Sequence, residues 1–247
     1  MSSQNQLKFA EPLRNLRATD CYFYHTMEVP GLGLVKGEWD LRDIVDQYLG
    51  KPALAAKRVL EIGPASGFLT AEMEKRGADV VAVEVPDDPG WDFVPYPAAL
   101  LAPLEWPRRQ GMRALKNSWW YVHTAYQLKA RLIYGNVYEL PDVIGTFDIA
   151  VMAAVLLHCH SPLQVIDQCA KRADTLIITD RFFPELSGSP VCRLEPTADN
   201  KTWDTWWAFS TDAISNFLGV LGFTIDSLYT YTDNRMRPLF TITATRR

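Results

Sequence analysis

Residues 58–84 read RVLEIGPASGFLTAEMEKRGADVVAVE, and this stretch is the strongest indication of fold in the chain. Residues 58–62 form a short apolar run with little charge, which is typical of a strand buried in a parallel sheet. A glycine-rich turn follows at once, and residues 68–76 then predict a helix that Gly77 ends. Residues 79–85 form a second apolar run. The order of strand, turn, helix and strand predicts a Rossmann-like βαβ unit.

The turn and the two strand ends indicate a nucleoside cofactor without phosphate. Gly63 and Gly67 let the backbone bend sharply and approach a ligand, because they have no Cβ. The turn reads GPASG, so Ala65 stands where a dinucleotide turn, G-x-G-x-x-G, has its second glycine. Glu61 would repel a phosphate but suits the ammonium of a methionyl group, and Glu84 can accept both hydroxyls of a ribose. These features favour S-adenosyl-L-methionine (SAM), with S-adenosyl-L-homocysteine (SAH) as the product. The alternative is a nucleotide-type turn kept for structure alone.

The composition is that of an ordinary globular protein. The chain has 247 residues, 48% of them hydrophobic and 22% charged, which suffices for one well-buried α/β domain with an insertion or an N-terminal extension. The net charge of −4 gives no general attraction to nucleic acid. The four cysteines form no C-x-x-C motif, so we expect a cytoplasmic protein with no metal site. No apolar stretch approaches the length of a membrane span.

Strands and helices continue to alternate toward the C-terminus. We expect strands at 131–137, 147–153 and 175–180, helices at 110–129, 162–173 and 211–221, and a final strand pair at 224–232 and 239–245. The pattern predicts an α/β fold with a Rossmann-like, seven-stranded, mostly parallel sheet, helices on both faces and a C-terminal antiparallel hairpin. Ligands of such sheets bind beyond the C-terminal strand ends, so the first four strand ends should line one site.

The sequence also suggests how the regions around this unit are used. Residues 1–57 are expected to form an N-terminal extension that covers the cofactor site, with a helix at 40–49. Residues 58–247 form the main domain, with an acceptor-side insertion at about 86–130 and a long loop at 181–210. The proline-rich stretch 85–107 predicts neither a regular helix nor a central strand.

Several stretches resemble a known family. They are YFYHTMEVPGLG and GEWDLR in the N-terminal extension, the 58–84 unit, GNVYELP at 135–141, FDIAVMAAVLLHCHSPL at 147–163, and the last helix with its Gly222-Phe223 pair. Together they resemble the class I SAM-dependent methyltransferases, and among these the CmoB-like group, often described as tRNA wobble-uridine methyltransferase-like. The glycine-rich turn corresponds to the first motif of the class and Glu84 to its acidic second motif.

The resemblance implies which residues contact SAM. They are Glu61, Gly63, Pro64, Ala65, Ser66, Gly67, Glu84, Asn136, Val137, Met152 and Ala153. Many class I enzymes carry an aspartate at the position of Asn136, where it binds the adenine amino group. CmoB itself uses a carboxylated SAM, bound through a tyrosine and arginines. This chain has Leu157-His158-Cys159-His160 after the fourth strand, without that tyrosine and those arginines, so ordinary SAM is expected.

Two histidines are candidates for a catalytic role. His158 follows the fourth strand, where a neutral imidazole can deprotonate an acceptor hydroxyl or, alternatively, hydrogen-bond the backbone of its own loop. His25, in YFYHT, would contact the acceptor or the cofactor, or pack as a loop histidine.

Four residues are candidates for binding the methyl acceptor: Trp120, His123, Arg181 and Trp207. The two tryptophans can stack on a flat acceptor or pack in the core. His123 can face the acceptor or the surface of its helix. Arg181 can bind an acceptor carboxylate or phosphate, or pair with a neighbouring acidic residue such as Glu185.

These observations predict an enzyme, a SAM-dependent methyltransferase acting on a small or medium-sized acceptor, with O-methylation of a sugar or secondary metabolite favoured. The excess of aromatic residues leaves a homodimer open. One alternative is a tRNA wobble-uridine modifying methyltransferase with a basic groove formed by Arg108, Arg109, Arg113 and Lys116. Another is a non-catalytic SAM-binding protein.

Overall fold

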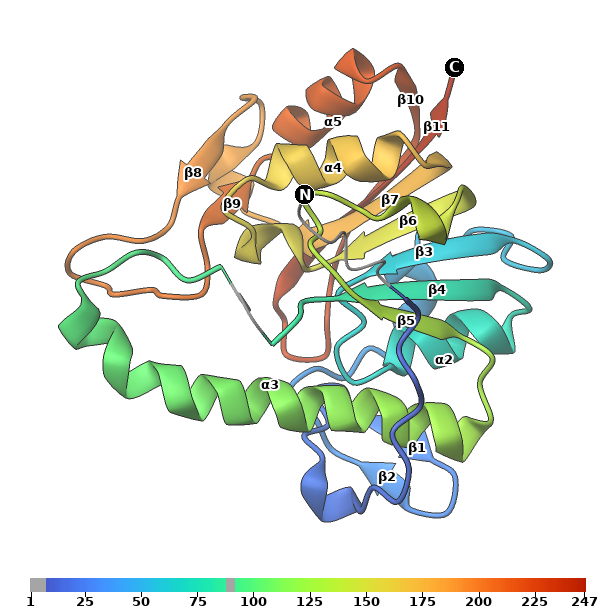
Figure 1. Cartoon of the computed structure of the whole chain (residues 1–247). Helices are drawn as coiled ribbons and strands as arrows, with labels where there is room; N and C mark the ends of the chain where they lie inside the picture. Colours follow the sequence, from blue (N-terminus) through green and yellow to red (C-terminus); the bar gives the residue numbers. More distant parts are fainter. Residues whose placement is uncertain (1–7, 88–91) are drawn as a thin grey trace, which may run out of the picture.

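The computed structural model describes residues 8–87 and 92–247, and a seven-stranded sheet forms its centre (Figure 1). The strands are β3 (Arg58–Ile62), β4 (Asp79–Glu84), β5 (Arg131–Tyr134), β6 (Phe147–Ala153), β7 (Ala173–Arg181), β10 (Phe223–Thr232) and β11 (Pro238–Arg246). Their order across the sheet is β10-β11-β7-β6-β3-β4-β5. Strands β3 to β7 are parallel, and β11 runs antiparallel to both of its neighbours.

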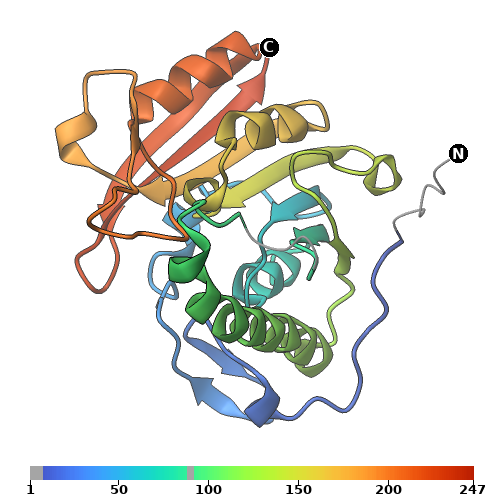
Figure 2. The same cartoon turned by 60° about the vertical axis from the view of Figure 1, so that its left-hand side comes forward.

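Helices cover both faces of this sheet, which confirms the predicted fold class. On one face lie α1 (Val45–Tyr48), α2 (Phe68–Lys75) and α3 (Ala98–Tyr126), and on the other α4 (Pro162–Ala170) and α5 (Thr211–Val220) (Figures 1 and 2). Short 3-10 helices are η1 (Ala18–Asp20), η2 (Asp142–Ile144), η3 (Leu156–His158) and η4 (Pro184–Leu186).

The strand residues supply two separate cores, because successive side chains of a strand point to opposite faces. In β3 and β4, Leu60, Val81 and Val83 belong to the core beneath α4 and α5. Val59 and Val80 belong to the core beneath α1, α2 and α3. All five side chains are fully buried. With both faces of the sheet covered, the strand ends are the natural place for a ligand.

Helix α3 corrects the sequence prediction for 85–107. It begins at Ala98 rather than at 110 and runs through Pro103 and Pro107. Each proline lacks an N–H and so removes one hydrogen bond of the helix. Both prolines are exposed, so water can bind the carbonyls that lose their partners. The buried Trp119 and Val122 anchor the C-terminal half of the helix on the sheet.

Two small hairpins flank the central sheet. In the N-terminal part, β1 (Met27–Val29) pairs with β2 (Gly33–Val35) beside α3, and the predicted helix at 40–49 is reduced to α1 (Figure 1). The long loop after β7 contains β8 (Cys192–Leu194) paired with β9 (Trp207–Phe209).

Parts of the predicted extension and insertion, residues 1–7 and 88–91, lie outside the described residues. The division into an extension that covers the cofactor site and a main domain stays a prediction. Within residues 8–87 and 92–247, no helix is long and apolar enough to cross a membrane.

Candidate functional site

A cavity of about 330 Å³ opens at the C-terminal ends of the central strands. Its wall is formed by Gly63, Val83, Glu84, Val85, Pro86, Asp92, Gly135, Asn136, Val137, Tyr138, Val155, His158, Cys159 and His160. These residues follow β3, β4, β5 and β6, as the sequence predicts for the first four strand ends. Five predicted site residues therefore meet in one cavity: Gly63, Glu84, Asn136, Val137 and His158.

The turn after β3 uses backbone conformations that favour glycine. Gly63 has φ +70°, and a Cβ there would lie 3.0 Å from Cγ2 of Val155. Ala65 has φ +50° although it carries a Cβ, a conformation that costs an alanine roughly 1 kcal/mol. Strain of this kind is found at ligand-binding sites, where the surrounding structure holds it in place. Ala65 directs its backbone N–H toward the Glu84 carboxylate, so the strained turn and the end of β4 act together.

Glu61 is a buried carboxylate at the end of β3. Its Oε2 accepts a hydrogen bond of 2.5 Å from Oγ1 of Thr70, and Nε1 of Trp119 donates to that hydroxyl at 3.1 Å. Its Oε1 is buried and has no hydrogen-bond partner among the described residues. Burial raises the pKa of Glu61 to about 8, against the hydrogen bond from Thr70. A buried acceptor left open in this way is suited to a cationic ligand group.

Glu84 is the second buried carboxylate, at the end of β4. The Val85 N–H donates to its Oε1 at 2.7 Å. Burial raises the pKa of Glu84, while the Val85 N–H and the positive charges of Lys116 and Arg108 oppose the rise. The carboxylate therefore sits in the cavity wall next to two cations, with oxygen atoms suited to hydroxyl donors.

These groups fit SAM as a ligand. The open oxygen of Glu61 matches an ammonium, Glu84 matches ribose hydroxyls, and the lack of a side chain at Gly63 lets a ligand approach the backbone. Asn136 and Val137 line the side of the cavity that follows β5. The Oδ1 of Asn136 accepts a hydrogen bond of 2.9 Å from the Tyr138 N–H and so shapes its own turn.

His25 lies behind the turn and outside the cavity wall. Its backbone N–H donates to Oγ of Ser66 at 3.2 Å, its Nδ1 lies 3.4 Å from the same oxygen, and its ring packs on Phe68. Burial lowers the pKa of His25 to about 4, so the ring is neutral. The contact joins the N-terminal part of the chain to the back of the turn, which corresponds to the packing alternative weighed for this residue.

His158 occupies the cavity wall in η3. Its Nδ1 lies 2.6 Å from the backbone oxygen of Asp204. A carbonyl oxygen only accepts, so Nδ1 carries the proton and the neutral ring keeps its lone pair on Nε2. Burial lowers the pKa of His158, and the positive charge of Arg108 lowers it further, while Asp204 acts in the opposite direction. The backbone hydrogen bond thus sets the tautomer that a general base at Nε2 requires.

Other predicted cofactor residues lie next to the cavity rather than in its wall. Pro64, Ser66 and Gly67 complete the turn after Gly63. Met152 is a fully buried core residue near the end of β6, and Ala153 is partly buried behind it. Neither residue lines the cavity, so any contribution from this strand end comes from the backbone.

Two predicted acceptor residues are placed away from the cavity. Trp120 is 2% exposed in the core beneath α3, where Nε1 donates to the Tyr134 hydroxyl at 3.0 Å. His123 packs on Trp119, and its Nε2 lies 3.0 Å from the Ala130 carbonyl. Both residues are on the part of α3 that faces the sheet, so helical periodicity directs them into the core.

The other two predicted acceptor residues lie at the surface beyond β7. Arg181 is exposed at the strand end and packs over the ring of Phe183 at 5.0 Å. Trp207 begins β9, and its Nε1 donates to the His160 carbonyl at 3.2 Å. Neither residue lines the cavity, and the predicted partner of Arg181, Glu185, pairs with Arg193 instead.

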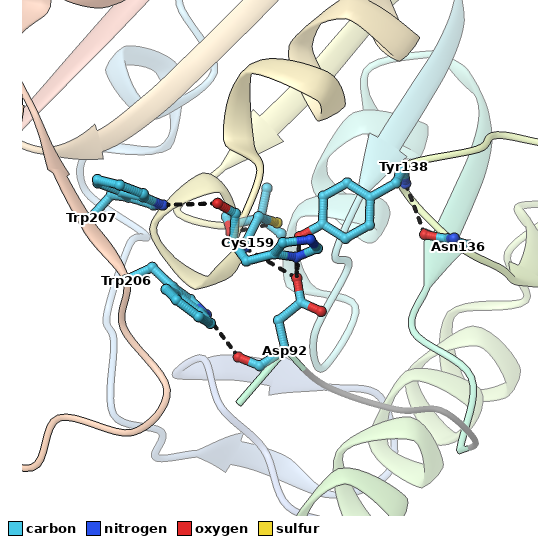
Figure 3. Close-up of polar contacts among 8 residues, drawn as sticks. Asp92, Asn136, Tyr138, Cys159, Trp206 and Trp207 are labelled. Atoms are coloured by element: carbon cyan, nitrogen blue, oxygen red, sulfur yellow. Dashed lines mark hydrogen bonds and ion pairs between the residues drawn. The ribbon is translucent and has the colours of Figure 1, made fainter. Parts of the chain in front are cut away.

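Asp92 joins a polar network at the mouth of the cavity that the sequence did not reveal (Figure 3). Its Oδ2 accepts hydrogen bonds from the Tyr138 hydroxyl and from Nδ1 of His160, the latter at 2.8 Å. Nε1 of Trp206 donates to its backbone oxygen at 2.9 Å. The partners are 46 to 114 positions away in sequence, so no local pattern indicated the network.

Cys159 is buried beneath this network, where its thiol donates to the Val155 carbonyl at 3.4 Å. Burial raises the pKa of the thiol to about 12, as for an inert packing residue. Across residues 8–87 and 92–247, no group of three or more His, Cys, Asp or Glu side chains is arranged to hold a metal ion.

Comparison with known proteins extends these observations. Residues 37–216 match a protein family described as "Methyltransferase domain". No curated protein matches the sequence.

Three solved structures illustrate the likeness in fold. Magnesium protoporphyrin IX methyltransferase (ChlM) from Synechocystis PCC 6803, with bound SAH, has a TM-score of 0.52 and 17% identity, covering 84% of this chain and 82% of that one. The N-terminal domain of EvdMO1 with SAH bound has a TM-score of 0.56 and 15% identity, covering 90% of each chain. The 1,6-didemethyltoxoflavin-N1-methyltransferase of Burkholderia thailandensis, with its ligand and SAH bound, has a TM-score of 0.50 and 20% identity, covering 83% and 75%.

Proposed function

This chain belongs to the methyltransferase domain family and is a SAM-dependent methyltransferase of class I, and we propose that it methylates an oxygen atom of a small or medium-sized acceptor. The observation that carries the proposal is the meeting of Glu84 and His158 in one cavity wall, beside the buried open oxygen of Glu61. Two carboxylates, Glu61 and Glu84, can bind SAM, and a neutral imidazole protonated at Nδ1 can act as the general base in methyl transfer to a hydroxyl.

Support for a small acceptor comes from two sides. The net charge of −4 offers no general attraction to nucleic acid. The structural neighbours include proteins crystallised with small molecules, among them 1,6-didemethyltoxoflavin and, for the EvdMO1 domain, D-fucose. We also propose a cytoplasmic location, on the ground of four free cysteines, and membership of the CmoB-like group, on the sequence stretches quoted above. A homodimer stays a prediction.

We propose the following placement of the cofactor. Glu84 accepts the ribose hydroxyls, Oε1 of Glu61 faces the ammonium of the methionyl group directly or through water, and Asn136 and Val137 lie along the adenine. When bound, SAM supplies an electrophilic methyl group whose carbon–sulfur bond breaks as the carbon–oxygen bond forms, the sulfur keeping the electron pair. The remaining steps belong to residues of this chain.

His158 removes the proton. The acceptor hydroxyl donates to Nε2 and gives up its proton as the oxygen takes the methyl group, which leaves an imidazolium. The Asp204 carbonyl holds the ring in place and stabilises the charge through Nδ1. The imidazolium then releases the proton to water, because burial and Arg108 keep the pKa of His158 low. Positioning of the acceptor oxygen supplies much of the remaining rate.

A screen of hydroxylated small molecules tests this function. The enzyme is incubated with SAM and each acceptor, and both SAH release and the methylated product are measured. Product formation on an oxygen that falls in the His158→Gln variant supports the proposal. Methylation of nitrogen or carbon would contradict the O-methylation assignment, and methylation of a tRNA but of no small molecule would contradict the acceptor class.

A further inference from the structure

Asp180 is a buried carboxylate that the proposed methyl transfer does not use. It lies near the C-terminal end of β7, the strand beside β6, and is 3% exposed. Its Oδ1 accepts a hydrogen bond of 2.7 Å from the Arg181 N–H. Its Oδ2 is buried and has no hydrogen-bond partner among residues 8–87 and 92–247. Burying a carboxyl group costs free energy, so this group needs a reason in the structure.

The side chain of Asp180 points to the face of the sheet on which η3 packs. Leu176 and Ile178 of β7 belong to the core beneath α4 and α5. Asp180 is two positions beyond Ile178 and has the same orientation, because the side chains of a strand alternate between faces. Leu156 and Leu157 of η3 pack in that same core. Asp180 and η3 therefore meet on one side of the sheet.

The neighbours of His158 in the sequence lie close to this carboxyl group. The Leu157 N–H is directed at it and favours its charged form. Burial and the charges of Asp92 and Asp180 raise the pKa of the Cys159 thiol. Residues on both sides of His158 thus interact with Asp180, which places the carboxyl group next to the turn that carries the proposed base.

The turn η3 has only three residues and depends on partners outside itself. The first N–H groups of a helical turn have no carbonyl partner within it, and the Leu157 N–H is one of them. The Leu157 carbonyl accepts a hydrogen bond of 2.8 Å from the Trp206 N–H, and Nδ1 of His158 bonds the Asp204 carbonyl. Both of these partners belong to the loop between β8 and β9. Asp180 adds a polar link from η3 to the central sheet.

The strength of this link depends on the ionisation of Asp180. Burial raises the pKa of Asp180 to about 7, against the N–H and the charge of Arg181 and the Leu157 N–H. An N–H group binds a carboxylate more strongly than a neutral acid. The Cys159 thiol and the Tyr48 hydroxyl also interact with this charge, and burial keeps both protonated at neutral pH. The link should therefore be stronger above pH 7 than below it.

We propose that Asp180 is a positioning residue that holds η3, and through it the His158 ring, in the geometry required for proton removal from the acceptor. The inference rests on the proposed function, since it concerns the general base of that reaction. The carboxylate of Asp180 holds the Leu157 N–H, while the Asp204 carbonyl selects the tautomer of His158. Asp180 itself exchanges no proton with the acceptor.

Nitrogen NMR of protein labelled with ¹⁵N-histidine, at saturating SAH, tests the inference without an acceptor. The His158 signals are those that His158→Gln removes. The wild-type protein should show one tautomer, protonated at Nδ1. Asp180→Ala should give mixed tautomers and move the pKa of His158 back toward about 6.5. Asp180→Asn, whose amide oxygen can still accept the N–H groups, should keep the wild-type spectrum. Asp174→Ala, at the exposed start of β7, is the matched control and should change nothing.

A kinetic cycle shows whether Asp180 acts through His158. With an acceptor found in the screen, Asp180→Ala should lower kcat about tenfold or more, because a small displacement of a catalytic group is costly, and KM and SAH affinity should stay the same. In the His158→Gln background the same substitution should cost little more, because residues that act as a unit are not additive. Asp180→Val, which fills more of the buried space, replaces Asp180→Ala if that variant does not fold.

The outcomes separate this inference from the proposed function. Unchanged His158 signals in folded Asp180→Ala or Asp180→Val would overturn the inference, whatever the reaction catalysed. An equal loss of kcat in the wild-type and His158→Gln backgrounds would also contradict it, because Asp180 would then support the fold alone. A wild-type protein that binds no SAH, or that methylates no oxygen, would instead overturn the proposed function.

Discussion

The two sides of the proposed site differ in how far apart their residues lie in the sequence. The side that we assign to the cofactor uses the ends of β3 and β4 and the turn after β3, so Glu61, Gly63 and Glu84 lie within one short stretch of sequence. The side at which the sequence predicts the acceptor joins the N-terminal half of α3 to the loop between β8 and β9, nearly a hundred residues further on, as the contact of Arg108 with Trp203 shows. The first side is built from backbone geometry and buried carboxylates, and the second from charged and aromatic side chains. Substitutions on the cofactor side should therefore mainly change SAH binding, whereas those on the acceptor side should change the rate or the preference for an acceptor.

The largest effect is expected for Gly63→Arg. Its backbone has φ +70° and a Cβ would lie 3.0 Å from Val155, so the new side chain must displace the turn or fill the cavity. SAH binding and methyl transfer should both be lost, by more than about a hundredfold in affinity. Gly111→Arg on α3, where a Cβ meets nothing within 4 Å, is the matched control. Full SAH affinity in the folded Gly63→Arg variant would show that this turn does not bind the cofactor.

His158→Gln should lower kcat by roughly a hundredfold or more while SAH affinity stays the same, because a general base contributes on that scale. The measurement is the rate with a confirmed acceptor, together with SAH titration. His123→Gln serves as control, since that ring hydrogen-bonds Ala130 away from the cavity. An unchanged kcat would mean that positioning alone drives the reaction and that His158 supports its loop.

Glu84→Ala should weaken SAH binding by about ten- to a hundredfold, the usual result of removing hydrogen bonds to a charged group. Glu139→Ala, an exposed carboxylate in the loop that follows Asn136, is the comparison and should have no effect. If calorimetry gave equal affinities for both variants, Glu84 would have to be a structural partner of Lys116 and Arg108 only.

The smallest effect is a pH dependence of stability on the cofactor side. Burial raises the pKa of Glu61 to about 8 and that of Asp180 to about 7, far above their unfolded values near 4. Unfolded histidines have a pKa of about 6.5, so above about pH 7 most of them are neutral and the two carboxyls dominate. The folded protein then holds protons that the unfolded chain has lost, and the Tm of the ligand-free protein should fall from about pH 7 to 8. Glu61→Gln should flatten the decline, and a Tm that rises over this range would contradict it.

The sequence predicts the strands around the turn better than the helix and loops of the predicted acceptor side, for physical reasons. β3 and β6 have the predicted bounds because a parallel strand covered on both faces must be a short apolar run. The position of β11 between β7 and β10 follows from pairing across the sheet, which no single strand encodes. The predicted start of α3 was wrong, because a helix tolerates exposed prolines where water replaces the lost hydrogen bonds.

The role of a helical side chain was harder to predict, because it depends on whether that face of the helix packs on the sheet or faces the site. Trp120 and His123 were expected at the acceptor, yet α3 turns both toward the sheet. Arg108 and Arg113 lie on the same helix but on the part that extends past the sheet, where solvent and a cavity replace the core. The network of Asp92, Tyr138 and His160 depends on contacts between segments that are distant in sequence. Local sequence patterns therefore do not predict it.

The most direct test of the central claim is a calorimetric titration of the purified protein with SAH, with NAD as control, in two buffers of different ionisation enthalpy. We expect binding in the micromolar range, no comparable binding of NAD, and release of a proton near pH 7, because the ligand ammonium draws Glu61 into its charged form. Glu61→Gln should remove the proton release. No binding of SAH, or a preference for NAD, would contradict the assignment of the turn and the two carboxylates to SAM.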